Sequence, residues 1–414
     1  MGTDAMIFEF GEFRLDVRER RLLRGGQPVP LTRKALETLR VLLERSGRLV
    51  TKDELMRHIW PDTVVEENNL NQNISVLRRA LGERTAGPRF IETVPGVGYR
   101  FVANVTKLGP SAGAPVAALE RTPRQEIRFC TTADRTRIAY AAVGAGPPLV
   151  KAANWLTHIE HEWESPVWGH WIREISQRHR LVRWDERGCG LSDWNADDLS
   201  LGAWVHDMET VVDALGLERF AVLGISQGGA AAIAYAARHP ERVSHLVLCG
   251  AYARGWRHRG NAEEAEARSA LLGLTRLGWG QNNPAFRQLF TTRFIPDAGA
   301  TEMEWFNDLQ RVSTSPEVAG RLMDSFSRVD VRGLLADVKA PAIVFHAQRD
   351  GVVPFDEGRL LAAGIPGSTF VPLPSRNHLL LEHEPAWGIF LRELGAFLGW
   401  RDGDPTGTST ASTD

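Results

Sequence analysis

The chain has 414 residues, a length that suits two or three domains. Its composition, 43% hydrophobic and 24% charged, is that of an ordinary globular protein and excludes a wholly disordered or fibrous chain. The net charge is −2, but residues 1–104 sum to +3 and the remainder to −5. We therefore expect an anionic partner for the N-terminal part alone.

The cysteine content and the absence of apolar runs set further limits. Cys130, Cys189 and Cys249 are too few and too scattered for a disulfide framework or a zinc site. We expect no metal and no cofactor. The sequence has neither a secretory signal pattern at its start nor an apolar run of 18 residues. It thus predicts a cytoplasmic protein that does not enter a membrane.

The first part of the chain predicts short strands, three helices and a hairpin. Two segments within residues 7–17 alternate apolar and polar side chains, as half-buried strands do. Leucines recur at helical spacing within residues 31–46. Thr51 and Glu54 form the pattern of a capping box, which begins the second helix. A Pro-Gly-Val-Gly turn within residues 89–105 predicts the hairpin.

The third predicted helix, residues 66–81, has two contrasting faces. One face is an apolar stripe typical of a core contact, made of Leu70, Ile74, Leu77 and Leu81. The other face carries amide, hydroxyl and guanidinium groups that can pair with base edges, from Asn68, Gln72, Ser75 and Arg79. A solvated polar face is the plainer interpretation of one such helix. The order of the elements favours a winged helix, in which this helix enters the major groove.

Residues 6–104 resemble the OmpR/PhoB-type winged-helix DNA-binding domain. The matching segments are LTRKALETLRVLLERSGRLVTKDEL, NISVLRRALGE and FIETVPGVGYRF. The resemblance implies double-stranded DNA as the partner, with residues 66–81 as recognition helix and 90–101 as wing. We expect phosphate contacts from basic residues such as Arg78 and Arg100. Because one recognition helix reads few base pairs, we also expect a homodimer.

The remaining chain divides into a linker, a large domain and a tail. Residues 105–124 hold several Pro, Gly and Ala residues and no aromatic residue, which predicts a linker. Residues 401–414 are polar and predict a disordered tail. Between them, in residues 125–400, short apolar runs alternate with helical stretches. This alternation predicts a doubly wound, mostly parallel sheet with helices on both faces.

A Gly-x-Ser-x-Gly pattern lies between a predicted strand and an alanine-rich helix, with Ser226 at its centre. In that position the pattern is typical of a nucleophile turn, which needs small neighbours. A phosphate-binding turn is the alternative, but the Gly-Lys-Ser/Thr signature is missing. Asp350 lies in the loop that follows the predicted strand PAIVFHA. His378 lies in the loop that follows the next predicted strand, FVPLP. Serine needs such a base, oriented by an acid, to become a nucleophile.

Residues 125–400 resemble the α/β-hydrolase fold, including WDERGCGLSD at residues 184–193. The resemblance implies Ser226 as nucleophile, Asp350 as orienting acid and His378 as base. It implies the Gln227 N–H as one oxyanion donor. The usual His-Gly loop is replaced here by Ala-Asn-Trp-Leu, so we expect the N–H of Trp155 as the second donor. The helical stretch at about 251–330 would be a lid over the pocket.

Together these features predict a one-component DNA-binding transcriptional regulator. Its C-terminal domain would bind, and hydrolyse, a small ester, thioester or lactone. One alternative is a serine esterase whose N-terminal domain is only a protein-interaction module. Another is a ligand receptor that has the hydrolase fold but no catalytic activity.

Overall fold

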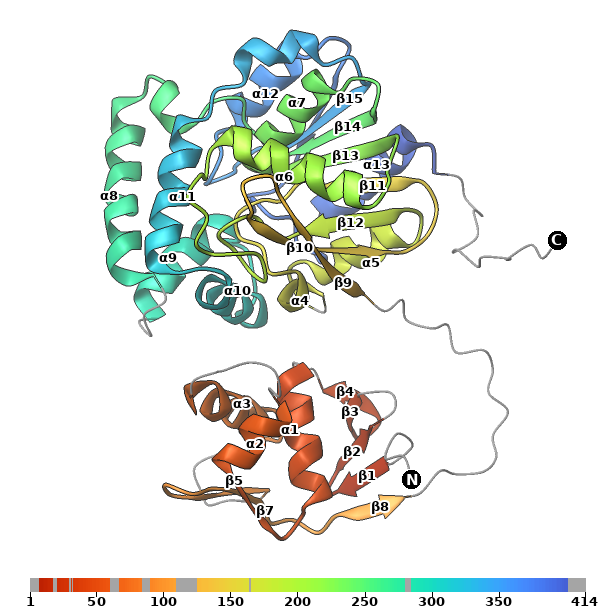
Figure 1. Cartoon of the computed structure of the whole chain (residues 1–414), viewed down its shortest axis with the longest axis vertical. Coiled ribbons are helices and arrows are strands. Elements are labelled where there is room, and N and C mark those ends of the chain that lie inside the picture. Colours follow the sequence, from red (N-terminus) through yellow and green to blue (C-terminus); the bar gives the residue numbers. More distant parts are fainter. Residues whose placement is uncertain are drawn as a thin grey trace, which may run out of the picture. The chain divides into compact units, whose positions relative to one another are not determined.

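The computed structural model describes the chain except residues 1–6, 18–20, 30, 32, 60–66, 84–89, 109–124, 164, 280–283 and 401–414. The chain forms two compact units, residues 1–120 and 121–414 (Figure 1). The predicted tail, 401–414, and most of the predicted linker lie outside the described residues. None of the described helices is both long and apolar enough to cross a bilayer.

The N-terminal unit begins with an antiparallel sheet in the strand order β4-β3-β2-β1-β8. Its strands are β1 (Ile7–Phe10), β2 (Phe13–Asp16), β3 (Arg21–Arg24), β4 (Gln27–Val29) and β8 (Thr106–Leu108). The sequence predicted β1 and β2 but not the other three. Strand β8 pairs with β1 within residues 105–124, the segment that the sequence predicts as a linker. The folded unit therefore extends to at least Leu108.

Three helices and a small sheet complete this unit. The helices are α1 (Arg33–Glu44), α2 (Lys52–Ile59) and α3 (Glu67–Ala80). The small sheet has the order β5-β7-β6, from β5 (Leu49–Thr51), β6 (Ile91–Val94) and β7 (Gly98–Phe101). The hairpin β6–β7 is the predicted wing, and α3 is the predicted recognition helix. These elements confirm the winged-helix architecture.

Local contacts explain why these helices form where they do. The N–H of Glu54 donates to Oγ1 of Thr51 at 3.2 Å, and the N–H of Thr51 donates to Oε2 of Glu54 at 2.9 Å. This is the predicted capping box, and it starts α2. The apolar stripe of α3 is buried in a core that also holds Phe8, Phe10, Phe13, Phe90 and Phe101.

The C-terminal unit is built on one sheet in the order β16-β15-β14-β13-β11-β12-β10-β9. Strands β9 (Glu126–Thr131) and β10 (Arg137–Val143) are an antiparallel hairpin, and β10 pairs antiparallel with β12 (Arg180–Trp184). The other pairs are parallel, through β11 (Pro148–Lys151), β13 (Phe220–Ile225), β14 (Val243–Cys249), β15 (Ala342–Ala347) and β16 (Thr369–Leu373). This is the mostly parallel sheet that the alternating pattern predicted.

Helices cover the sheet. They are α4 (Ile159–Glu162), α5 (Gly169–Ser176), α6 (Leu201–Ala214), α7 (Gly228–Arg238), α12 (Phe355–Gly364) and α13 (Pro385–Leu398). In Figure 1, α6 and α7 lie side by side in front of the strands. Helix α7 is alanine-rich and almost wholly buried, because it packs directly on β13 and β14.

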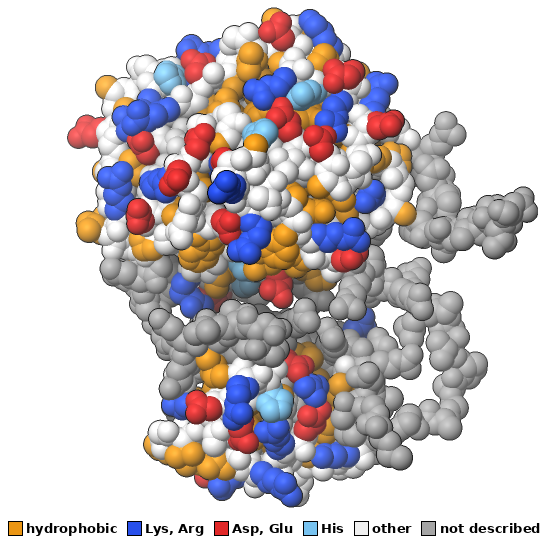
Figure 2. Space-filling view, in the orientation of Figure 1, with side chains coloured by type: hydrophobic (Ala, Val, Ile, Leu, Met, Phe, Trp, Pro, Cys, Tyr) orange, Lys and Arg blue, Asp and Glu red, His pale blue; other side chains and the backbone are white. Residues whose placement is uncertain are grey.

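A second group of helices is inserted between β14 and β15, where the sequence predicted a lid. They are α8 (Ala262–Gly278), α9 (Pro284–Phe294), α10 (Ala300–Ser313) and α11 (Pro316–Arg328). Figure 1 shows them gathered at one end of this unit, on the left of the view. On the visible surface of both units, basic and acidic side chains are interspersed (Figure 2).

Candidate functional site

Ser226 lies in the turn between β13 and α7, as predicted. Its backbone has a φ of +53°, a region that costs a residue other than glycine roughly 1–3 kcal/mol. Small neighbours are required here: a Cβ at Gly224 would lie 2.6 Å from the Cα of Gly229, and one at Gly228 would lie 2.6 Å from the carbonyl oxygen of Ala153. The turn presents Ser226 to a cavity while only 8% of the residue is exposed.

Asp350 and His378 follow β15 and β16, and their side chains meet. Nδ1 of His378 lies 2.6 Å from Oδ2 of Asp350, and both side chains are completely buried. The backbone N–H groups of Val352 and Val353 donate to the other oxygen, Oδ1, at 2.7 and 2.9 Å. Burial raises the pKa of Asp350, but His378 and these donors outweigh that effect and hold it below its ordinary value.

The histidine therefore carries its proton on Nδ1 when neutral, and Nε2 is the acceptor. Nε2 of His378 is buried and has no hydrogen-bond partner among the described residues. The serine turn is connected to His378 through the end of β14. The N–H of Ser226 donates to the carbonyl of Cys249 at 3.1 Å, and Gly250, which follows Cys249, packs against the His378 ring. The fold thus brings Ser226, His378 and Asp350 to one edge of the sheet.

The two residues predicted to supply oxyanion donors, Trp155 and Gln227, are in contact through the Gln227 side chain. The N–H of Trp155 donates to Oε1 of Gln227 at 2.9 Å, so this donor already has an acceptor. Nε2 of Gln227 in turn donates to Oε1 of Glu186 at 3.0 Å. The N–H of Trp155, expected from the sequence as the second oxyanion donor, thus has the Gln227 side chain as its acceptor in this structure. The amide side chain of Gln227, the residue after the nucleophile, is long enough to accept this hydrogen bond.

Glu186 is a residue of this site that the sequence analysis did not single out. It is 2% exposed, and its Oε2 has no hydrogen-bond partner among the described residues. Burial raises the pKa of Glu186 to about 8, although the bond from Gln227 opposes the shift. At neutral pH the carboxyl group is therefore mostly protonated.

The rest of the segment around Glu186 has a structural role. Asp185 accepts the N–H groups of Ile159 at 2.8 Å and Leu191 at 2.7 Å. The buried guanidinium of Arg187 binds both carboxylate oxygens of Asp207, at 2.7 and 2.6 Å. These contacts fix the loop that carries Glu186 behind the serine turn.

The cavity next to Ser226 lies between the sheet edge and the lid, and has a volume of about 90 Å³. Its apolar lining includes Trp155, Trp256, Leu271, Leu272, Phe290, Phe294 and Phe326. Three aromatic residues of the predicted lid segment, Trp256, Phe290 and Phe294, are thus part of the lining. Trp279 instead supports it, stacking on Trp155 with ring centroids 5.1 Å apart.

In the N-terminal unit, the polar face of α3 is only partly described. Ser75 and Arg79 are exposed there, and Ser75 Oγ donates to the carbonyl of Asn71 at 2.9 Å. Asn68 and Gln72 lie on the same helix, but their side chains are outside the described part of the structure. The arrangement leaves Arg79 on the face opposite the buried stripe.

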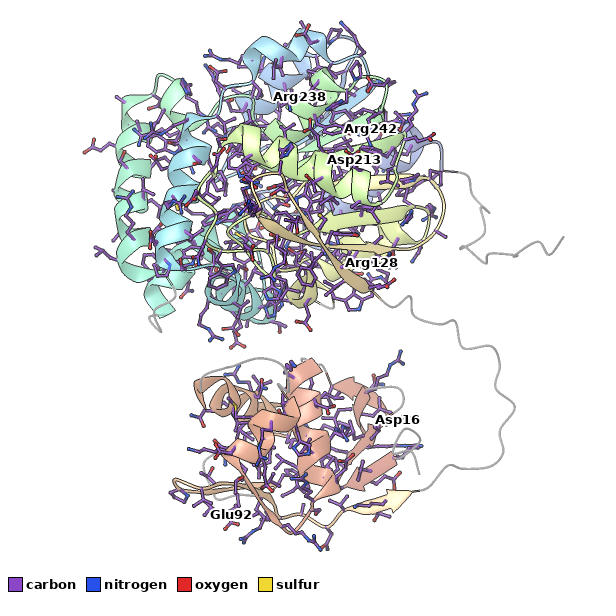
Figure 3. The ribbon with its side chains drawn as sticks, in the orientation of Figure 1. Asp16, Glu92, Arg128, Asp213, Arg238 and Arg242 are labelled. Atoms are coloured by element: carbon purple, nitrogen blue, oxygen red, sulfur yellow. The ribbon has the colours of Figure 1, made fainter. Side chains whose placement is uncertain are left out.

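The two arginines expected to bind phosphates have contacts within the unit. Arg78 Nη2 donates to the carbonyl of Ile91 at 3.0 Å and to Oγ1 of Thr93 at 2.6 Å, and so connects α3 to the wing. Arg100 Nη1 lies 3.2 Å from Oε2 of Glu92, which is labelled in Figure 3. Both side chains remain partly exposed. Their contacts give them a structural role in the unit that the sequence analysis did not foresee.

Within the described residues, no group of three or more His, Cys, Asp or Glu side chains could hold a metal ion. What the C-terminal site offers is a serine in a strained turn, a histidine with a buried acceptor nitrogen, and a carboxylate that orients the histidine. These groups suit nucleophilic attack on a carbonyl compound.

The topology places the C-terminal unit in the hydrolase class of doubly wound folds, and comparisons with known proteins agree. Residues 161–385 match the family model described as alpha/beta hydrolase fold, and residues 26–101 match the model described as transcriptional regulatory protein, C terminal. The chain therefore belongs to the α/β-hydrolase fold family. It combines this hydrolase domain with a DNA-binding regulatory domain of the OmpR/PhoB type.

Individual relatives cover one domain or the other. The AB hydrolase superfamily protein YisY of Bacillus subtilis is 26% identical over 255 residues, 60% of this chain and 91% of that protein. The transcriptional regulator HilA of Salmonella typhi is 38% identical over 108 residues, 26% of this chain and 19% of HilA. An esterase from Exiguobacterium antarcticum is 23% identical and superposes with a TM-score of 0.56, covering 66% of this chain and 98% of that structure.

Proposed function

We propose that the protein is a DNA-binding transcriptional regulator whose hydrolase domain cleaves a small ester, thioester or lactone. The observation that carries the catalytic part is the buried His378–Asp350 pair, whose Nε2 has no hydrogen-bond partner among the described residues. A buried acceptor nitrogen without a partner is costly to maintain, and proton transfer from the Ser226 hydroxyl would give it one.

In the proposed reaction, Oγ of Ser226 attacks the carbonyl carbon while its proton passes to Nε2 of His378. Asp350 stabilises the imidazolium. The tetrahedral intermediate collapses to an acyl-enzyme, and His378 returns the proton to the departing alcohol, thiol or lactone hydroxyl. Water then attacks the acyl-enzyme by the same route and releases the acid.

The oxyanion that develops during attack needs donors, and the Gln227 N–H is the first of these. The Trp155 N–H becomes the second once the oxyanion displaces the Gln227 side chain. That displacement costs one hydrogen bond. We therefore expect slow turnover of a well-held ligand.

The N-terminal domain would bind duplex DNA with α3 in the major groove and the wing on the backbone. Each phosphate contact adds about 0.9 to the slope of log K against log salt. We further propose that the protein binds operators as a homodimer, which would let two α3 helices read two half-sites. Sedimentation of the full chain with a duplex that carries two half-sites would test this stoichiometry.

A ligand receptor without turnover is the second candidate function. The hydrogen bond from the Trp155 N–H to Gln227 favours this receptor function. A site whose oxyanion donor already bonds to a side chain is poorly prepared to stabilise an oxyanion. In that case the hydrolase fold would only bind the ligand. Binding alone can shift the protein between two states with different DNA affinities.

One experiment with two readouts separates the candidates. Ser226→Ala should lower the turnover of 4-nitrophenyl hexanoate by roughly 10³-fold or more, because nucleophile and base act as a unit. DNA affinity is measured with and without the ester, for wild type and variant. We expect the variant to lose turnover and keep the DNA response. Wild-type protein that binds the ester without cleaving it would favour the receptor, and a response to the hydrolysed product alone would make the product the signal.

A further inference from the structure

Three arginines line the cavity beside Ser226, and all three come from the segment between β14 and β15. Arg259 follows the short 3-10 helix Trp256–His258, Arg268 lies on α8, and Arg293 lies on α9. The described lining includes no aspartate or glutamate. A cavity that is otherwise mostly aromatic and aliphatic thus carries positive charge next to the serine.

The acidic residues around the cavity do not balance this charge. Glu264 is shared, since its Oε1 lies 2.6 Å from Nη1 of Arg259 and 3.3 Å from Nη2 of Arg268. Glu357 is 3.8 Å from Nε of Arg259, but it is held more closely by Arg254, at 3.0 Å. The charge of Asp350 also attracts Arg293, but Asp350 is already paired with His378.

Two of the arginines are fixed by one edge only. Nη2 of Arg268 donates to the carbonyl of Val352, and Nη2 of Arg293 donates to the carbonyl of Gly351 at 3.1 Å. The Nε and Nη1 groups of Arg268 and Arg293 donate to no acceptor in the described part of the chain. Each guanidinium is thereby oriented while part of its donor fork stays open, as in a preorganised site for a planar anion.

The protonation behaviour agrees with a concentration of positive charge. Burial, followed by the repulsion of Arg293 and Arg259, lowers the pKa of Arg268 to about 10. Arg268 therefore stays charged at neutral pH. Repulsion between buried cations is relieved when an anion binds among them.

We propose that Arg259, Arg268 and Arg293 form an anion subsite, and that the ester cleaved at Ser226 carries a carboxylate group. The inference rests on the proposed hydrolysis and names its substrate class. The apolar body of this ligand packs on the leucines and phenylalanines of the same cavity. Its carboxylate binds the open guanidinium edges, away from the carbonyl that Ser226 attacks.

Two matched substrates test the subsite in the full-length protein. One is the mono-4-nitrophenyl ester of adipic acid, and the other replaces its free carboxylate by a carboxamide of nearly the same shape. Charge-assisted hydrogen bonds of this type change affinity by about tenfold to a hundredfold. We expect wild-type kcat/KM to favour the carboxylate by that factor. Arg268→Met and Arg293→Met should reduce the preference toward one, and the exposed Arg276→Met on α8 should leave it intact.

The ratio between the two substrates separates recognition from a structural role. If Arg268 and Arg293 only hold the loop at residues 351–352, their loss lowers turnover of both esters and leaves the ratio unchanged, which overturns the proposal. Equal wild-type turnover of both esters also overturns it, while hydrolysis stands. Calorimetry measures the binding of both esters to the Ser226→Ala protein, which is a readout independent of turnover. If neither ester is cleaved but binding favours the carboxylate through these arginines, the subsite stands and the proposed hydrolysis fails. If neither cleavage nor selective binding is seen, both fail.

Discussion

The two units of the protein place their candidate functional side chains in opposite surroundings. In the hydrolase domain, Asp350 and His378 are enclosed and bonded to each other. In the DNA-binding domain, Arg79 lies on an exposed helix face, and Arg100 pairs with Glu92 at the surface. An enclosed polar group needs its partners within the fold, whereas an exposed one can exchange a protein partner for DNA. The first kind of site is defined by packing and the second by its ligand.

This contrast predicts that substitutions have their largest effects in the hydrolase domain and their smallest in the DNA-binding domain. Substitutions at Glu186, Gly250, Arg79 and Arg78, and Thr51, taken in order of decreasing effect, test that gradient.

The largest effect is expected at Glu186. Its pKa rises from 4.5 in the unfolded chain to about 8, so the folded state keeps a proton that the unfolded state loses between these pH values. Stability therefore falls as pH rises through this window, by up to about 1.4 kcal/mol per pH unit, and levels off above it. Glu186→Gln removes the penalty. The variant should exceed wild type by a few kcal/mol at pH 9 and match it near pH 4.5, as measured by urea unfolding with tryptophan fluorescence.

Exposed Glu266→Gln on α8 is the matched control and should show no such pH dependence. Parallel stability curves for wild type and Glu186→Gln would mean that Glu186 is ionised in the folded protein. Glu186 would then behave like a surface carboxylate, which would contradict the contrast between enclosed and exposed polar groups.

Gly250→Ala should follow. A Cβ at Gly250 would lie 3.1 Å from Cε1 and 3.2 Å from Nδ1 of His378, and the residue has a φ of +56°. Contacts this short require the imidazole to shift by a few tenths of an ångström. We expect this shift to lower ester turnover by up to about 10²-fold. Gly216→Ala is the control: its φ is +62°, and nothing lies within 4 Å of the added Cβ. If both variants lose the same turnover, backbone strain and not the histidine is responsible.

In the DNA-binding domain, Arg79→Ala should cost about 1–3 kcal/mol of binding to a preferred duplex and relax its sequence preference. Fluorescence anisotropy at fixed salt measures both effects, and exposed Arg57→Ala on α2 is the control. Arg78→Ala should behave differently, because it removes the bonds to Ile91 and Thr93 and so lowers the melting temperature of the domain. If Arg78→Ala lowers DNA affinity but leaves the melting temperature unchanged, Arg78 contacts DNA and does not have the structural role assigned to it.

The smallest effect is expected at the capping box of α2. Thr51→Ala should lower the stability of the DNA-binding domain by about 1 kcal/mol. A double-mutant cycle with Glu54→Ala checks the mechanism, since the two residues bond to each other. Strictly additive effects would show that the pair does not act as a box.

The sequence predicted the elements that have strong periodicity and the residues that follow strand ends. Helix α3 was expected at 66–81 and spans Glu67–Ala80. Strands β3, β4, β5 and β8 were missed, because their three or four residues do not alternate between apolar and polar side chains as those of β1 and β2 do.

In the C-terminal unit, chain order predicted that Ser226, Asp350 and His378 follow three strands, and in the structure they follow β13, β15 and β16. The bond from Gln227 to Glu186 spans 41 residues, and no local pattern marks such a pairing. The cavity arginines were missed for the same reason, since lid sequence shows helical spacing but not which residues face the serine.

The linker joins two edge strands, and its length has a consequence for assembly. Strand β8 ends at Leu108 and β9 begins at Glu126, so 17 residues separate two folded edges. Fully extended, this stretch reaches about 60 Å. DNA half-sites one helical turn apart are separated by about 34 Å. Two hydrolase domains tethered to such an operator would meet at an effective concentration in the millimolar range. A self-contact too weak to form dimers in free solution would then suffice, and DNA itself would act as the dimerising ligand.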